Sequence, residues 1–187
     1  MKISIPESLE DITLEQYQKY MQLDAESKDY EAQVFCLFTG LDLEYYSKVP
    51  QKDINDIVNQ ITKALESEGE FKQTFFINGV EFGLIPNFDK ITGGEYSDLI
   101  IYSKKEENGY NHQLDRLIAV LYRPITNKDK LGNYQIEIYK GTSGHLKYIQ
   151  KLPISIVNGC LSFFLTLSEQ LENHIQACMV EEQLKVN

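Results

Sequence analysis

Tryptophan is missing from this 187-residue chain, and histidine and cysteine are scarce, with three of each. Cys36, Cys160 and Cys178 are far apart and lie in apolar sequence, which is typical of reduced core residues and predicts a reducing compartment. The histidines are isolated, and neither H-x-x-x-H nor C-x-x-C spacing occurs, so no metal site is predicted. No apolar run approaches the roughly 18 residues of a membrane span.

Positive charge is also in short supply. The 18 Lys and Arg stand against 28 Asp and Glu, which gives a formal net charge of -10. Such a field repels phosphate backbones and anionic headgroups, so we expect neither direct nucleic-acid binding nor membrane binding. The N-terminal sequence lacks the apolar core of a secretory signal, which favours a cytoplasmic protein.

Large aromatic side chains are plentiful by contrast. Twelve Tyr and nine Phe, in a chain that is 42% apolar, predict an aromatic-rich core. The length fits one domain over 1–187, with candidate lobes at 1–68, which has a helical pattern, and 69–187, which combines a β-hairpin with helices.

A six-residue echo marks two helix starts. ITLEQY at 12–17 recurs as ITGGEY at 91–96. In both copies a threonine, Thr13 or Thr92, is followed three residues later by Gln or Glu, which is the pattern of a capping box. Gene duplication and the reuse of a good helix start both explain the echo, and the sequence alone leaves the choice open.

The clearest strand signal is an Asn78-Gly79 pair between apolar runs at 71–77 and 80–85, which predicts a hairpin with a type I′ turn. A further strand is expected at 134–139, and a loop at 126–133. Periodicity and stop signals predict helices near 14–23, 31–39, 53–65, 93–102, 114–122, 143–150 and 153–180. The predicted fold is α+β, mainly α, with two helical hairpins flanking a β-hairpin and a long C-terminal helix.

Two local features carry structural predictions. Gly93-Gly94 weakens a helix start, and we interpret the pair as a place where the hairpin packs closely; an anion site there is the weaker reading. Arg123 lies at the end of a predicted helix. It is expected to be a buried structural arginine, bidentate to a carboxylate such as Glu95 or Asp98, and the alternative is a contact with a partner.

Catalytic motifs do not stand out, and we predict no catalytic, cofactor-binding or metal-binding residues. The competing hypothesis is a small enzyme with an unrecognised site around His112, Asp115 and Arg123, because His and Asp three residues apart can meet on one helix face.

Three stretches together resemble a known group of proteins. They are SIP at 4–6 leading into ITLEQY, FGLIPNFD at 82–89 leading into ITGGEYSDL at 91–99, and AVLYRPI at 119–125. The chain resembles small proteins from the structural and assembly genes of tailed bacteriophages, and among them tail assembly chaperones. The resemblance implies a protein of the infected cell that holds tail-tube or tape-measure proteins before they polymerise.

We therefore expect a non-enzymatic protein that binds other phage proteins during tail or virion assembly. A stoichiometric virion component of the tail, connector or capsid is the alternative, with location in the virion, and an antagonist of a host factor is a third. The oligomeric state stays open. The candidate partner-binding residues are Phe76, Val80, Phe82, Arg123 and Met179.

Overall fold

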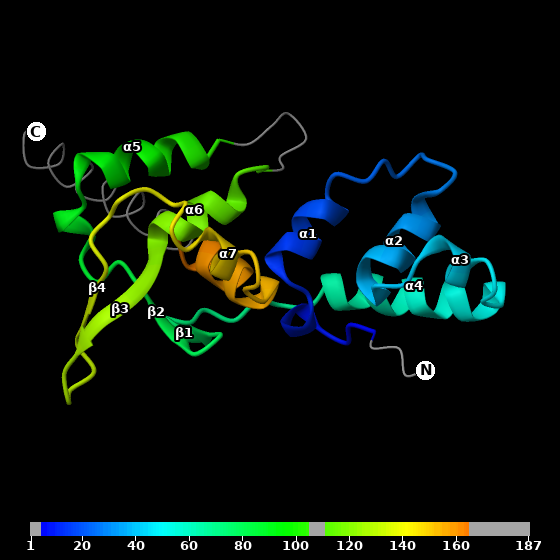
Figure 1. Cartoon of the computed structure of the whole chain (residues 1–187), viewed down its shortest axis with the longest axis horizontal. Coiled ribbons are helices and arrows are strands. Elements are labelled where there is room, and N and C mark those ends of the chain that lie inside the picture. The colour runs from blue at the N-terminus through cyan, green and yellow to red at the C-terminus, as the bar shows by residue number, and fades with distance from the viewer. Residues whose placement is uncertain (1–4, 105–110, 165–187) are drawn as a thin grey trace, which may run out of the picture.

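The computed structural model describes residues 5–104 and 111–164 and has the predicted class, an α+β fold that is mainly helical. Figure 1 shows an elongated molecule in which α1 to α4 form one lobe and the sheet with α5 to α7 forms the other. Among the helices of these described residues, none is both long and apolar enough to cross a membrane.

The N-terminal lobe is built from short helices. They are the 3-10 turn η1 (Leu9–Asp11), α1 (Leu14–Tyr20), α2 (Tyr30–Thr39), α3 (Leu43–Tyr46) and α4 (Gln51–Leu65). Helix α2 ends at Gly40, whose φ of 69° is the left-handed conformation that glycine adopts without strain. Helix α4 buries Ile54, Ile61 and Ala64 on one face, as its apolar spacing predicts.

The second lobe holds an antiparallel sheet in the order β1-β2-β3-β4. Its elements are β1 (Thr74–Ile77), β2 (Val80–Leu84), η2 (Phe88–Lys90), α5 (Gly93–Tyr102), α6 (Leu114–Leu121), β3 (Tyr122–Lys128), β4 (Tyr134–Ile136), α7 (Leu146–Ile149) and a helical segment at 154–164. The predicted hairpin is confirmed, since both Asn78 and Gly79 have positive φ, 50° and 79°.

Strand β3 is the main departure from the predicted elements. The loop expected at 126–133 begins later, because the chain passes directly from α6 into β3, which pairs with β2 on one side and β4 on the other. The sequence did not predict this strand because it contains Pro124, and proline is rare in central strands. Its carbonyl nevertheless accepts a hydrogen bond from Glu137 N at 2.9 Å, and a register shift between Ile125 and Asn127 accommodates the irregular pairing.

Aromatic rings fill the core behind the sheet, as predicted. Phe75 stacks on Phe82 with ring centroids 5.7 Å apart, and Tyr122 lies 5.0 Å from Phe75. Cys160 is buried and Cys36 half-buried, and both are free thiols. Cys178 and the part of the predicted C-terminal helix beyond 164 lie outside the described residues.

Backbone contacts join the two lobes. Leu14 N donates to Leu152 O and Ile154 N donates to Ile12 O, both at 2.8 Å. The chain that follows α4 also crosses the helical segment at 154–164, and a glycine lies on each side of the crossing, Gly69 and Gly159. A Cβ on Gly69 would lie 2.6 Å from Gly159 N, and a Cβ on Gly159 would lie 2.2 Å from the carbonyl carbon of Glu70. Only glycine allows so close a crossing.

The close packing predicted at Gly93-Gly94 is wrong. Within residues 5–104 and 111–164, nothing lies within 4 Å of a Cβ placed on Gly93, and the nearest atom to one on Gly94 is an ordinary van der Waals neighbour in Tyr139 at 3.8 Å. Close backbone approach occurs instead at Gly69 and Gly159, which belong to segments far apart in sequence.

Candidate functional site

Strand β1 forms an open edge of the sheet. Among the described residues it pairs only with β2, and the pair Ile77 and Val80 flanks the two-residue turn. In such a hairpin alternate residues bond to the partner strand, so Phe75 and Ile77 face β2 while the N–H and C=O groups of Thr74 and Phe76 point to the open edge. The bond from Leu84 N to Gln73 O, at 3.0 Å, follows the same alternation.

The side chain of Phe76 lies on the outer surface beside that edge. It is 70% exposed, whereas its neighbours Phe75 and Ile77 are buried. An exposed aromatic residue next to unpaired backbone groups is the chemistry that binds an extended peptide by strand addition. We call this surface, made of Thr74 and Phe76 on β1, the β1 edge.

The other candidate contact residues lie elsewhere. Val80 is half-buried against the core, and Phe82 is fully buried in the middle of the sheet, so Phe82 offers no surface for a partner. Arg123 is 5% exposed and belongs to the interior as well. Met179 lies outside the described residues. Of the five candidate residues, only Phe76 and the partly exposed Val80 are therefore accessible to a partner in the described part of the chain.

Arg123 forms the expected buried ion pair, with Glu95 as its partner. Its Nη2 contacts Glu95 Oε1, and both side chains are almost completely buried. The bidentate geometry that we predicted does not form, because Glu95 Oε2 accepts hydrogen bonds from the N–H and the hydroxyl of Thr92, at 2.6 and 2.7 Å. Arg123 Nε therefore has no hydrogen-bond partner among the described residues.

The Glu95 carboxylate makes two sets of polar contacts, and together they keep it ionised. It closes the capping box of α5 and also neutralises Arg123. Burial raises the pKa of Glu95, but the hydrogen bonds from Thr92 and the charge of Arg123 outweigh burial and hold the pKa below its ordinary value. Glu95 is therefore an anion at neutral pH.

Tyr139 completes the polar cluster. Its hydroxyl donates to Asp98 Oδ2, so the carboxylate that we considered as an Arg123 partner has a different partner. The guanidinium carbon of Arg123 lies 5.3 Å from the centre of the Tyr139 ring, within cation–π range. Burial, followed by the hydrogen bond to Asp98, raises the pKa of Tyr139 above its ordinary value.

The residues of the enzyme hypothesis have separate partners. Asp115 accepts hydrogen bonds from Gln150 Nε2 at 3.0 Å and Gln18 Nε2 at 3.4 Å, where α6 meets α1 and α7. Arg123 is engaged with Glu95. The backbone carbonyl of His112 also accepts a hydrogen bond from Gln18 Nε2, at 3.1 Å. His112 and Asp115 therefore share a contact with Gln18, Arg123 belongs to a different one, and an activity built on the three stays a prediction.

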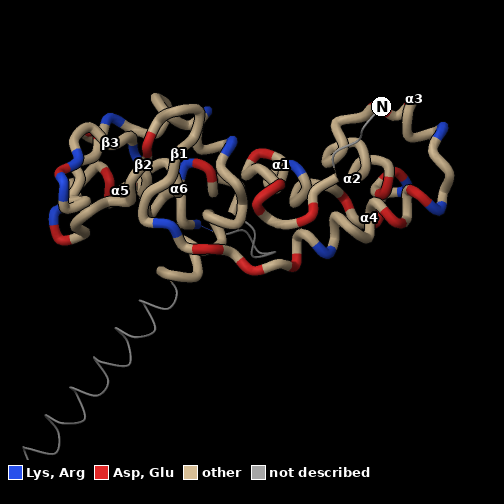
Figure 2. The backbone as a smooth tube through the Cα atoms, turned by 90° about the horizontal axis from the view of Figure 1, so that it is seen from below, with Lys and Arg blue, Asp and Glu red and all other residues tan. Residues whose placement is uncertain are grey.

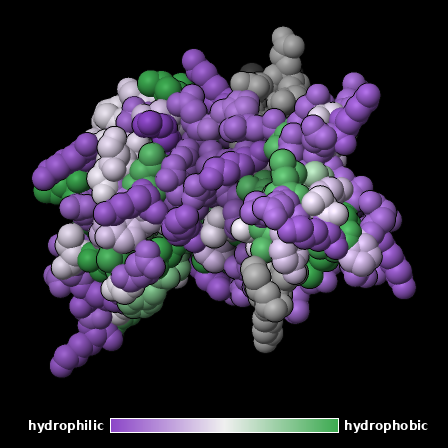
Figure 3. Space-filling view, turned by 45° about the vertical axis from the view of Figure 1, so that its right-hand side comes forward, coloured by the Kyte–Doolittle hydropathy of each residue, from purple (hydrophilic) through white to green (hydrophobic). Residues whose placement is uncertain are grey.

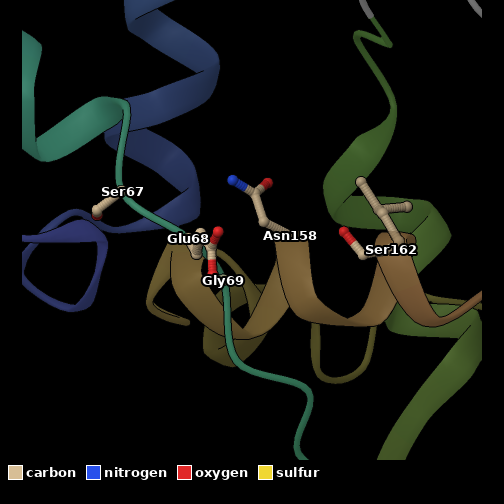
Figure 4. Close-up of a pocket in the computed structure, with 6 residues that line it drawn as sticks. Ser67, Glu68, Gly69, Asn158 and Ser162 are labelled. Carbon is tan, nitrogen blue, oxygen red and sulfur yellow. The ribbon is translucent and has the colours of Figure 1, made fainter.

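A groove lies where the two lobes meet. It has a volume of about 520 Å³ and is lined by Ser67, Glu68 and Gly69 after α4 and by Asn158, Leu161 and Ser162 of the 154–164 helical segment. Figure 4 shows Asn158 and Ser162 projecting from the same side of that segment. The lining is mainly polar and holds one carboxylate, Glu68, without any Lys, Arg, His or Cys among those six residues. We assign it no chemistry.

Surface charge and apolar surface are both dispersed. Figure 2 shows Asp and Glu interspersed with Lys and Arg along both lobes. On the face drawn in Figure 3, apolar residues form separate patches among polar ones. Within residues 5–104 and 111–164, no group of three or more His, Cys, Asp or Glu is arranged to hold a metal ion.

Comparisons with protein-family models, with curated proteins and with solved structures found no match. The functional argument therefore depends on the chain's own surfaces and on the resemblance carried by its sequence. The β1 edge was foreseeable from the Asn78-Gly79 hairpin. The burial of Phe82, which leaves Phe76 as the exposed ring, was not foreseeable. The sequence did not predict β3, and β3 is the strand that pairs with the other side of β2.

Proposed function

We propose that this chain is a non-enzymatic tailed-phage protein that binds other phage proteins during tail or virion assembly, and that it acts as an assembly chaperone. The single observation that carries the proposal is the β1 edge, with its unpaired backbone groups and the exposed ring of Phe76. An extended segment of a tail-tube or tape-measure protein would add a strand there and place an apolar side chain against Phe76.

The binding test uses two variants that attack different parts of the β1 edge. Phe76→Asp introduces a charge on the exposed ring's position, and Thr74→Pro removes an N–H that points away from β2, a change that edge strands tolerate. Each variant should lower capture of the tail-tube or tape-measure protein at least about tenfold. Leu43→Asp is the matched control, because Leu43 is 62% exposed on α3 in the other lobe.

Circular dichroism and thermal unfolding establish that each variant is folded. Unchanged partner capture by folded Phe76→Asp and Thr74→Pro proteins would refute the assignment of the β1 edge. Loss of capture by Leu43→Asp alone would move the surface to the helical lobe.

Quantitative mass spectrometry of purified phage particles beside infected-cell lysate tests the chaperone role. A chaperone should be abundant in lysate and missing from particles. Presence at fixed copy number in the particle would contradict that role and indicate a structural virion component, which is the alternative function for the same surface.

A further inference from the structure

The β1 edge differs in charge from one end to the other. At the end beside the turn, Lys128 pairs with Glu81, so the two charges cancel. At the end before Thr74, two acidic segments approach the strand. They are residues 5–11, which include η1, and residues 63–72, which run from the last turn of α4 towards β1, and together they hold six carboxylates and two lysines.

The six acidic residues are all exposed. They are Glu7, Glu10 and Asp11 in the first segment and Glu66, Glu68 and Glu70 in the second. Lys72 lies between the segments, with its Nζ 3.0 Å from Glu70 Oε2 and 3.8 Å from Glu10 Oε1. Leu9 N also donates to Ser67 Oγ at 3.2 Å, so the two segments lie side by side.

The two lysines do not neutralise this end of the edge. Lys72 is shared by Glu10 and Glu70, and Lys63 lies in the last turn of α4. Six carboxylates less two lysines leave a local excess of four negative charges. Charge is mixed over the surface as a whole, but several acidic positions follow one another along the chain that joins the lobes (Figure 2). Salt screens this field over roughly 10 Å, so it acts on groups that are bound close by.

A strand added to β1 extends towards this acidic end. Thr74 and Phe76 present the unpaired backbone groups, and Glu70 precedes Phe76 by six residues, which is about 20 Å of extended chain. Every pair of neighbouring strands in the sheet is antiparallel. An added strand that keeps this arrangement runs opposite to β1, so its C-terminal part lies towards Glu70 and Glu10.

Charge therefore decides which class of segment fits the β1 edge. A segment that is acidic beyond its paired residues is repelled, and a neutral one gains nothing from the carboxylates. A second copy of this chain brings a formal net charge of -10 to the same surface, which opposes self-pairing. A segment with lysine or arginine in its C-terminal part meets opposite charge there.

We propose that the β1 edge binds a basic extended segment of a partner protein. The segment pairs antiparallel with β1, places an apolar side chain beside Phe76 and carries lysines or arginines about six residues further towards its C-terminus. This inference rests on the proposed function, because it names the chemistry of the segment that the same edge binds. Backbone pairing and Phe76 hold the segment, while the carboxylates select its charge and its direction.

Four labelled peptides of about twelve residues test both the charge and the direction. The basic peptide alternates valine and threonine in its first half and lysine and serine in its second half. One control has glutamine in place of the lysines, a second has glutamate, and a third has the two halves in reverse order. Fluorescence anisotropy with the full chain measures the four affinities.

The basic peptide should bind best. We expect it to bind about tenfold more tightly than the glutamine peptide at low ionic strength, and within about twofold of it at about 0.5 M salt. The glutamate peptide should bind more weakly than the glutamine peptide. The reversed peptide should lose most of the tenfold gain, because its lysines lie at the turn end of β1.

Charge variants identify the carboxylates that act. Glu10→Gln and Glu70→Gln keep the size of the side chain and should each weaken the basic peptide about threefold, without changing the affinity of the glutamine peptide. Both side chains are more than half exposed, so both variants should fold. Glu26→Gln is the matched control, because Glu26 is exposed in the connection between α1 and α2 and should leave both affinities unchanged.

Phe76→Asp separates this inference from the proposed function. Equal binding of the basic and glutamine peptides, both lost in Phe76→Asp, would overturn the basic segment and leave the β1 edge in place as the binding surface. Failure of every peptide to bind, or binding that Phe76→Asp leaves unchanged, would contradict the β1 edge itself and therefore both proposals. Self-association of the chain that Phe76→Asp relieves in sedimentation would identify a second copy as the occupant and overturn the basic segment.

Discussion

The helix starts at Thr13 and Thr92 share one local chemistry and differ in what anchors them. In each, the threonine oxygen accepts from the backbone N–H three residues on, at 3.2 Å for Gln16 and 3.3 Å for Glu95. In each, the third residue accepts from the threonine N–H in return, at 3.0 and 2.6 Å. Both capping boxes are therefore complete, as the sequence predicted.

Their anchors are of different kinds. The first start is held by backbone hydrogen bonds to 150–154, such as Leu14 N to Leu152 O, and its Gln16 amide is neutral. The second is held by the buried ion pair between Glu95 and Arg123. A capping box tolerates either Gln or Glu, but only a carboxylate can also neutralise a buried cation. The exchange of an amide nitrogen for an oxygen thus separates a half-buried neutral cap from one that also neutralises a buried cation.

The largest expected effect comes from Glu95→Gln. The amide retains the capping geometry but leaves the Arg123 charge buried without a counterion, so the free energy of unfolding should fall by about 3–5 kcal/mol. Urea unfolding at neutral pH measures it. Gln16→Glu is the matched exchange at the other start and should change the free energy by less than about 1 kcal/mol. Equal losses from the two exchanges would contradict the comparison.

A double replacement separates the ion pair from the cap. Glu95→Gln with Arg123→Met removes the buried charge along with its partner, so part of the stability lost by Glu95→Gln alone should return. A double variant less stable than the single one would show that Arg123 contributes through its packing against Tyr139 instead.

The second prediction concerns pH. The pKa of Glu95 lies below its ordinary value of 4.5, so the stability that its ionised form contributes is complete above that pH and is lost as the pH falls through the lowered pKa. The difference in unfolding free energy between wild type and Glu95→Gln should therefore be constant from neutral pH down to about 5 and shrink in more acidic buffer. Gln16→Ala has no carboxylate at its cap, and its difference from wild type should not follow this curve.

Removing the cap threonines should have a smaller effect. Thr13→Ala should cost about 1 kcal/mol, the usual value for an N-cap hydroxyl. Thr92→Ala should cost more, up to about 2 kcal/mol, because the Thr92 hydroxyl also donates to the charged Glu95 carboxylate. Thermal and urea unfolding of both variants measure this order, and the reverse order would indicate that Glu95 does not depend on Thr92.

The smallest effect concerns the two residues after each threonine. The first start has Leu14-Glu15 where the second has Gly93-Gly94, and a Cβ on Gly93 would meet no atom of the part of the chain that the structure describes. Gly93→Ala should stabilise the protein by about 0.5 kcal/mol, since alanine lowers the entropy of the unfolded chain. Gly159→Ala is the opposite control, because its Cβ would overlap the backbone of Glu70 and should destabilise the fold.

Local sequence determined the features that involve neighbouring residues. The capping boxes, the αL stop at Gly40 and the Asn78-Gly79 turn each depend on atoms within four residues of one another, so short patterns predict them well. The burial of Arg123 beside a carboxylate was also foreseeable, because an arginine that directly follows an apolar segment needs a counterion when it is buried.

Only the tertiary structure decided the contacts between distant segments. Strand β3 exists because β2 and β4 lie on either side of it, although Pro124 and its polar neighbours argue against a strand. The same placement buries Phe82 and leaves Phe76 at the open edge. The crossing of Gly69 and Gly159 brings together residues 90 positions apart, and no local pattern reports that two backbones meet. Local hydrogen bonds fix where an element starts, whereas burial depends on which surfaces the whole chain brings together.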